Sequence, residues 1–494
     1  TYGYDCTPSA DGSSTRLIVF DITDRSAPVQ VRSIDLSGSY IASRRIGTAV
    51  HTVVADPGSV GPPLETRLEG DRGSCTPALD KVRLSMAYQE LREANRKRIE
   101  AFRVETSFPT VTDSLGGGNL TASCPNTYRS SLGDGQSFTT LVSVDLAQAA
   151  PPKTSTIVSR PGHVYASAES LYLAVPHTRG DAGWYAGYES EDVASDIHQF
   201  AVSTDAQATR YRASGLVKGG VLNQFAMDEH EGKLRVATSA GRVPSPDVHS
   251  TVSVLESVGS SLNLVGKVDH IAPTEDIRSV RWDGNRGYMV TFKKTDPLYV
   301  IDTAVPERPA ILGELKIPGF STYMHMMDET HLLTIGYDAD DQGSFAYFTG
   351  ILLQIFDVSD PKNPRQTHVE RIGTRGSSSE ALTNHLAFNF FAEKNLLSIP
   401  LTVCEAEGDR YFDAHMTFSG LAVYDVTAAG GFVARGRIEH PPTSTGTGYD
   451  GASCSNWWTQ ASSQVKRSVI MDDTVYSVAL DVIKARDLGA LSTP

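Results

Sequence analysis

Short apolar segments, many of them alternating with polar residues, follow one another along nearly the whole chain. Residues 17–20, 287–292 and 351–356 are examples, and they are rich in β-branched and aromatic side chains. Gly, Pro, Asp and Asn stand at the boundaries of these segments. This combination is typical of β-strands joined by tight turns. The pattern therefore predicts an all-β protein.

One segment has a different period. Residues 76–105 contain no Gly, and their only Pro is Pro77, where a proline fits the first turn of a helix. Thr76 can cap that turn. Apolar residues recur at helical spacing, and charges fill the other face, including a basic run at 96–98. We predict a helical insertion that lies on the β body, with the basic run either solvated or used for docking.

Two sequence phrases recur in alternation and define the architecture. The first is an apolar strand that ends in Asp and leads into a Pro-containing turn, as at 19–22 and 355–358. The second is a tight hairpin with a polar turn, as at 231–236 and 329–333. Two hairpins make four strands, and the units recur every 40–60 residues or so, roughly the spacing of propeller blades. We therefore predict that residues 1–494 form a single β-propeller of four-stranded antiparallel blades.

The two ends of the sequence bear on how such a ring closes. The first phrase appears at 17–22 without a preceding hairpin, and the last hairpin, near 469–480, is followed by one further strand at 482–488. The N-terminal strands can therefore complete the last blade and remove free sheet edges. Seven blades fit, and so do eight if an upstream strand pair exists. The same seam can also accept a strand from a neighbouring chain.

Six strings carry a resemblance to a known family: 38–44, 222–229, 234–238, 295–302, LGELKIPGFS at 312–321, and 378–382. They resemble a family of secreted bacterial proteins with a C-terminal β-propeller domain, distantly related to WD40 propellers. The resemblance covers nearly the whole chain and implies an exported or cell-envelope protein with no established activity. Family members usually carry an acidic upstream segment that begins the first blade, and this sequence begins without it. The number of blades and the partner of Cys6 therefore stay open.

Charge and composition narrow the classes of partner. The 494 residues carry a formal net charge of −14 and no long basic run, whereas a nucleic-acid partner requires a basic surface. The acidic balance suits divalent cations or a basic protein surface. No segment approaches the roughly 20 apolar residues of a membrane-spanning helix, and the chain opens at Thr1 rather than Met. We expect a processed protein that is secreted, extracellular or in the cell envelope, without a transmembrane segment.

Five cysteines fit an oxidising compartment. Cys75 and Cys124 bracket one polar region, and Cys404 and Cys454 bracket another. Loops of this kind are commonly closed by disulfides in exported proteins. We predict the bridges 75–124 and 404–454 and leave Cys6 unpaired. The alternative is five free thiols. No CxxC pair is present to indicate a zinc or redox site.

Two groups of residues are candidate metal ligands. Asp338, Asp340 and Asp341 precede Gly343, and alternating carboxylates before a Gly turn can bind calcium; an acidic hairpin turn is the alternative. In a propeller the first strand of each blade lines the central channel. His163, His325 and His385 fall near the starts of such strands and can converge there on a metal ion. Unrelated surface or packed histidines are the alternative, because the strand register is not fixed by the sequence.

The sequence favours binding over catalysis. It has no GxSxG, HExxH or P-loop string, while Trp457 and Trp458 form a candidate aromatic platform for a glycan or peptide, or else a packed loop. We expect a binding or scaffolding module on the cell surface, with calcium as a candidate stabilising ion. A hydrolase, oxidoreductase or metalloprotein with a site on the channel face is one alternative. A subunit of an extracellular filament or complex is another.

Overall fold

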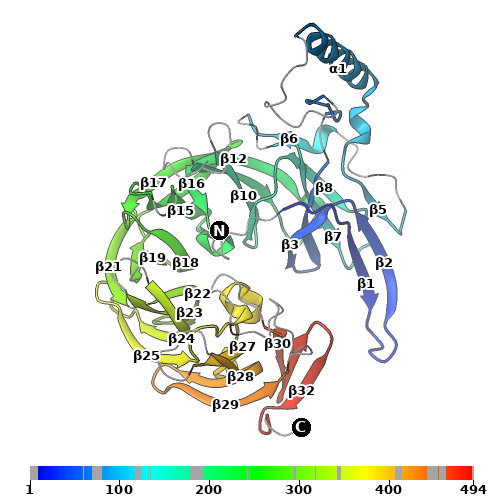
Figure 1. Cartoon of the computed structure of the whole chain (residues 1–494). Coiled ribbons are helices and arrows are strands. Elements are labelled where there is room, and N and C mark those ends of the chain that lie inside the picture. Colours follow the sequence, from blue (N-terminus) through cyan, green and yellow to red (C-terminus); the bar gives the residue numbers. More distant parts are fainter. Residues whose placement is uncertain are drawn as a thin grey trace.

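The protein is strand-rich throughout, as the sequence predicts. The computed structural model describes residues 9–58, 61–68, 81–116, 119, 124–131, 133, 135–178, 193–241, 243, 245–292, 296–317, 319–341, 346–406, 414–441, 454 and 463–491. Its sheets follow one another around a common centre (Figure 1). Its α-helix, α1 (Lys81–Ala101), falls within the segment for which helical periodicity predicts a helix.

Three sheets contain four strands that follow one another in sequence and pair antiparallel. Their strands are β18 (Asp276–Asp283), β19 (Arg286–Phe292), β20 (Asp296–Asp302) and β21 (Ala310–Ile317); β22 (Phe320–Asp328), β23 (His331–Asp341), β24 (Ala346–Asp357) and β25 (Arg365–Ile372); and β26 (Asn389–Phe391), β27 (Leu396–Glu405), β28 (His415–Thr427) and β29 (Gly431–Glu439).

The other sheets are less regular. A nine-stranded sheet consists of two antiparallel groups joined by one residue pair, Ser214 with Ser261. Its strands are β9 (His163–Ala166), β10 (Ser170–Thr178), β11 (Val193–Ala201) and β12 (Arg210–Lys218), then β13 (Gly220–Val221), β14 (Met227–His230), β15 (Lys233–Ala240), β16 (His249–Val258) and β17 (Ser261–Ile271). A five-stranded sheet contains β3 (Ser39–Ile46), β4 (Ala49–Asp56), β7 (Phe138–Asp145), β8 (Lys153–Val158) and β6 (Thr127–Arg129).

The first and last sheets have three strands each. They are β1 (Thr15–Asp21), β2 (Val29–Leu36) and β5 (Val111–Asp113), and β30 (Val465–Met471), β31 (Thr474–Ala479) and β32 (Ile483–Asp487). The short 3-10 helices are η1 (Val104–Thr106), η2 (Cys124–Asn126), η3 (Ala206–Ala208), η4 (Gln224–Ala226), η5 (Glu380–Leu382), η6 (His385–Ala387) and η7 (Ala392–Lys394).

The core lies between neighbouring sheets, which explains why many strands read as continuous apolar runs. In β24, Ile355 belongs to the core shared with β27, whereas Phe356 belongs to the core shared with β19 and β20. Both side chains are at most 1% exposed. A strand covered on both faces has no polar face, so its sequence does not alternate.

The Asp-and-Pro phrase builds the turn after the third strand of a sheet. Asp357 accepts hydrogen bonds from the backbone N–H of Ser359 at 2.9 Å and from its hydroxyl at 2.6 Å, and these bonds lower the pKa of Asp357 to about 2. Gly313, on β21, faces the turn that follows β24. A Cβ there would lie 2.5 Å from the carbonyl oxygen of Pro361. The repeat therefore specifies the turn and the close contact between adjacent sheets.

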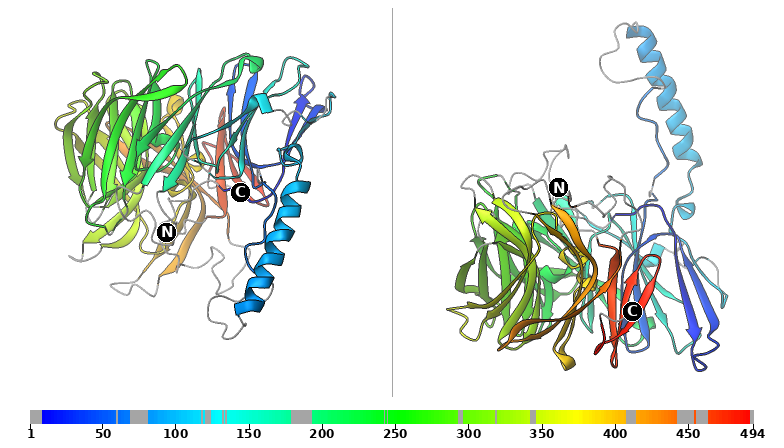
Figure 2. Two further views of the ribbon diagram at one scale, coloured as in Figure 1. Left: turned by 90° about the horizontal axis from the view of Figure 1, so that it is seen from above. Right: turned by 60° about the horizontal axis from the view of Figure 1, so that its bottom comes forward.

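The helical insertion differs from expectation. It lies between β4 and β7 in the chain, and α1 stands away from the sheets instead of lying on them (Figure 2). Val82, Met86 and Ile99 are each more than half exposed. The helical spacing of the apolar residues is present, but no sheet face covers that side within the described residues.

The seam also differs from expectation. β1 and β2 do not complete the last sheet; they form a separate sheet, in which β2 pairs with β5 from the insertion. The insertion supplies this third strand, a connection that the repeat pattern does not predict. The sheets contain three, four, five or nine strands, and such unequal sheets do not give a single blade count. Seven or eight blades of four strands each therefore stay a prediction.

No helix in the described ranges is both long and apolar enough to cross a membrane.

Candidate functional site

A cavity of about 190 Å³ lies among residues from several sheets, and short polar caps position its walls. Asn223 accepts a hydrogen bond from the backbone of Phe225 at 2.9 Å and so begins η4. Asn384 begins η6 in the same way through Leu386. The turns η5 and η6 lie inside the ring (yellow in Figure 1). The lining residues are His163, Leu222, Asn223, Phe225, Arg278, Thr322, Tyr323, Ala381, Leu382, Thr383 and His385.

A hydrogen-bonded chain joins β3 to the turns η4 and η6 beside this cavity. Arg44 on β3 donates from Nη2 to the Gln224 Oε1 atom at 2.6 Å, and Gln224 Nε2 lies 3.0 Å from His385 Nε2. Because arginine can only donate, Gln224 must present its oxygen to Arg44 and its amide hydrogens to His385. His385 therefore accepts at Nε2 and carries its proton on Nδ1.

Aromatic rings fill the space next to that chain. The ring of Phe225 lies 4.9 Å from the ring of His385 and 5.2 Å from that of Tyr323. Tyr323 in turn packs against Phe388 at 5.0 Å. The guanidinium of Arg281 sits 5.7 Å from the centre of the Phe225 ring, within the range of a cation–π contact. The site thus combines rigid apolar walls with fixed polar groups.

The three histidines predicted to line the channel are held neutral. Burial lowers the pKa of His163 to about 4. Burial, with a smaller effect from Arg281, does the same for His325. The pKa of His385 is also lowered to about 4, mainly by burial and then by the positive charges of Arg44, Arg467 and Arg281. These groups are therefore uncharged near neutral pH.

The structure brings two of these three histidines to one cavity. His163 and His385 line it, whereas Tyr323 and Phe388 pack against His325. The lone pair of His385 at Nε2 already accepts from Gln224. Within the described residues the three do not form a group whose donor atoms all lie close enough for one ion. A metal ion shared by all three stays a prediction without geometric support.

Acid is expected to destabilise the fold between about pH 6.5 and pH 4. The unfolded chain protonates His163, His325 and His385 near pH 6.5, whereas the folded protein does so near pH 4. The unfolded state binds more protons in this interval, so the free energy of unfolding falls as the pH falls, by at most about 1.4 kcal/mol per pH unit for each histidine. Urea unfolding at pH 7, 6 and 5 measures the slope. His163→Gln should reduce it, and an unchanged slope would contradict the assignment.

A second histidine cluster was missed by sequence reasoning. Donor atoms of His249, Asp269 and His270 all lie within 4.8 Å of one another. Lys218 Nζ, however, lies 2.8 Å from His249 Nε2 and 3.6 Å from Asp269 Oδ2, where a cation would bind. The two imidazole rings are stacked, 4.2 Å apart and 3° from parallel, so one ion cannot lie in both ring planes. The sequence carries no signal for this cluster, because the register of β16 against β17 brings it together.

The predicted calcium site is only partly described. Asp338 lies on β23, and its carboxylate accepts from Arg371 Nε at 2.8 Å. The backbones of Asp340 and Asp341 continue the same strand, and their side chains lie outside the described residues. An arginine partner already neutralises Asp338. Calcium binding at this position stays a prediction.

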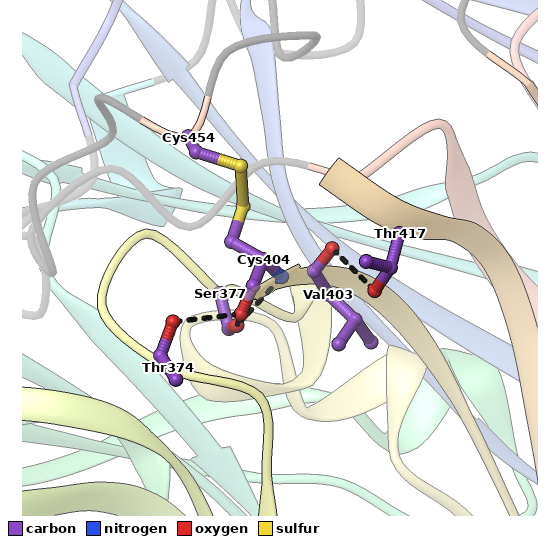
Figure 3. The surroundings of a disulfide bond; sticks show 6 residues. All are labelled: Thr374, Ser377, Val403, Cys404, Thr417 and Cys454. Atoms are coloured by element: carbon purple, nitrogen blue, oxygen red, sulfur yellow. Dashed lines mark hydrogen bonds between the residues drawn. A yellow bond between two sulfur atoms is a disulfide. The ribbon is translucent and has the colours of Figure 1, made fainter. Parts of the chain in front are cut away.

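The predicted Cys404–Cys454 disulfide is present, with Cα atoms 5.8 Å apart. Figure 3 shows how the segment before η5 is held against it. The hydroxyls of Thr374 and Ser377 both donate to the Cys404 carbonyl oxygen, at 2.9 and 3.1 Å, and Ser377 accepts from the Cys404 N–H at 2.9 Å. These contacts anchor the chain that continues into the cavity.

Several predicted residues fall outside what the structure describes. They are Cys6, Cys75, the side chain of Cys124, Trp457 and Trp458. The 75–124 bridge and the tryptophan platform therefore stay predictions.

Comparison with known proteins gives a family and two uncharacterised relatives. The family model described as "Beta propeller domain" matches residues 2–491. An uncharacterised protein of Archaeoglobus fulgidus is 37% identical over 184 residues, which are 37% of this chain and 27% of the relative. An uncharacterised protein of Methanocaldococcus jannaschii is 44% identical over 154 residues, 31% of this chain and 23% of the relative. The matched regions thus span about a quarter of each relative's length.

Proposed function

Since the chain belongs to the β-propeller domain family, we propose that it is a binding or scaffolding module that acts outside the cytoplasm. The observation that carries the proposal is the cavity near the centre of the ring. Its wall comes from β9, β18, β22 and the turns η4, η5 and η6. A preformed concave site of this kind, with apolar rings and a few fixed polar groups, is typical of ligand binding.

The serine hydroxyls of the segment that leads into η5 hold the backbone in place and are not free nucleophiles. Ser379 donates to the Pro400 carbonyl oxygen at 2.5 Å and accepts from Ala381 N. Ser377 is bonded to both backbone groups of Cys404. The Nε2 atom of His385 already accepts a hydrogen bond from Gln224. Within the described residues no serine is paired with a histidine base at this site, which favours binding over the hydrolase alternative.

Blocking the cavity is expected to abolish ligand binding without unfolding the protein. Thr383 lines the cavity and is exposed, so Thr383→Trp places a large ring at its mouth. Thr367→Trp, on the exposed face of β25, is the matched control. A thermal-shift panel of anionic, neutral and cationic small molecules should yield compounds that stabilise the wild type and Thr367→Trp but not Thr383→Trp. A panel in which every compound acts equally on all three proteins would refute the cavity as the binding site.

Assembly through the seam is a second candidate function. β1 pairs only with β2 among the described strands. Its apolar residues Ile18 and Phe20, and Ile22 directly after it, are 45–61% exposed. An open edge of this kind can pair with a strand from a second copy of the chain. We expect light scattering to show a dimer that Phe20→Lys converts to a monomer, while Tyr40→Lys, on β3 and also exposed, has no effect. A wild-type monomer at all concentrations would exclude this assembly.

A further inference from the structure

Three arginines beside the cavity have no carboxylate partner among the described residues. Arg44, Arg281 and Arg467 come from β3, β18 and β30, which belong to three different sheets. Other basic residues at this site do have partners: Arg278 lies 2.8 Å from Asp276, and Lys466 lies 2.9 Å from Glu380. The arrangement is unusual in a chain with a formal net charge of −14, where acidic partners are plentiful.

The contacts place these arginines around His385. Arg44 reaches it through Gln224, by hydrogen bonds of 2.6 and 3.0 Å. Arg281 reaches it through the Phe225 ring, 5.7 Å from the guanidinium and 4.9 Å from the imidazole. Arg467 lies on β30, which adjoins η6, and its charge acts on His385 together with those of the other two. Positive charge from three sheets thus surrounds His385, which lines the cavity, while the three arginines lie behind the lining residues.

Like charges around one residue repel one another, so an anion bound beside His385 stabilises the site. Each guanidinium has five N–H donors and cannot lose its charge. Arg44 uses one of its donors on Gln224 and another on its neighbour Ser43, which leaves others for a ligand. Arginine pairs well with carboxylate and phosphate groups, because its planar fork can donate two parallel hydrogen bonds to their oxygens.

We propose that a small oxyanion, a carboxylate or phosphate group, binds at the edge of the cavity beside His385, held by Arg44, Arg281 and Arg467. The aromatic wall of Phe225 and Tyr323 accommodates the carbon skeleton of an organic anion. This inference rests on the proposed binding function and narrows its ligand class. It also reverses the expectation from overall charge, which pointed to cations, and it disfavours a metal cation at His163 and His385.

Titration calorimetry at low ionic strength tests the inference, with sodium phosphate and sodium citrate as the probes. We expect saturable binding of one or both, and their relative affinities distinguish phosphate from carboxylate ligands. Arg281→Gln and Arg467→Gln should each raise Kd roughly tenfold to a hundredfold, as expected for loss of a hydrogen bond to a charged group. Arg281→Lys should retain part of the affinity. Sodium chloride at matched ionic strength should give no saturable heat.

Arg435→Gln is the matched control, because Arg435 pairs with Asp425 at 3.1 Å on β29. Its Kd should equal that of the wild type, and circular dichroism should show that all variants are folded. The inference fails if neither probe binds, or if Arg281→Gln and Arg467→Gln bind as tightly as the control. If neither anion binds, but neutral or cationic compounds bind and Thr383→Trp abolishes their binding, the proposed ligand class is wrong and the binding function stands.

Discussion

Replacement of Arg32 by alanine is expected to lower the free energy of unfolding by about 3–5 kcal/mol, because it leaves a buried carboxylate without its partner. Arg32 on β2 donates to Asp113 on β5, at 2.6 Å from Nη2 and 3.1 Å from Nε. The two side chains are 5% and 1% exposed. Nη2 also donates to the Ala150 carbonyl oxygen at 2.7 Å. One side chain therefore connects the first sheet, the insertion and the segment after β7.

The charge of Asp113 makes this loss large. Burial raises the pKa of Asp113, but hydrogen bonds from Arg32 and from the backbone of Leu115 outweigh burial and lower it below its usual value. The carboxylate is thus charged at neutral pH and needs its cationic partner. Arg16→Ala is the matched control, because Arg16 pairs with Asp35 at the surface, where the two side chains are 64% and 51% exposed. Such pairs contribute about 0–1 kcal/mol.

Urea unfolding monitored by circular dichroism compares the two variants. If Arg32→Ala and Arg16→Ala lower the free energy of unfolding equally, the buried pair does not hold the first sheet in place. Asp113→Asn separates charge from shape, since the amide keeps the size of the side chain. It should cost less than Arg32→Ala, because the Arg32 guanidinium keeps its hydrogen bonds to the Asp145 and Ala150 carbonyl oxygens, whereas Arg32→Ala leaves the carboxylate without its cation.

Loss of the Cys404–Cys454 disulfide is expected to lower the free energy of unfolding by about 2–4 kcal/mol. The two cysteines are 50 residues apart in sequence, so the bridge removes a large loop-closure entropy from the unfolded chain. Cys404 is fully buried on β27. The double variant Cys404→Ala/Cys454→Ala, compared with the wild type, measures the effect. A reducing agent should destabilise the wild type more than the double variant, in which only the predicted 75–124 bridge is left to reduce.

The same bridge tests the proposed location. In living cells treated with a thiol reagent before lysis, Cys404 and Cys454 should stay unmodified, because disulfides persist in oxidising compartments. Full labelling of both cysteines in the unfolded, unreduced protein would argue for a reducing compartment and against export. If reduction leaves the wild type as stable as before, the bridge has no structural role.

Local chemistry explains what the sequence alone determined. Apolar runs such as 351–356 predicted strands, and the Asp-and-Pro phrases predicted the turns that follow them, because an Asp side chain caps its own turn whatever surrounds it. The helical spacing of the insertion predicted α1. The positions of Cys404 and Cys454 on either side of a polar region were sufficient to predict the disulfide between them. Each of these features depends on neighbours in the sequence or on residue type.

Only the tertiary structure decided the features that depend on register and on neighbouring sheets. A shift of one residue turns every side chain of a strand to its other face, so the sequence could not show that His163 and His385 share a cavity while His325 packs behind Tyr323. Nor did it indicate that Arg44, Arg281 and Arg467 all lie near His385, because they are far apart in sequence and belong to three different sheets. The pairing of β2 with β5 and the outward position of α1 likewise depend on which surfaces the insertion meets. Overall charge favoured a cationic ligand, and the tertiary structure points to an anion because it gathers around His385 three arginines that have no carboxylate partner among the described residues.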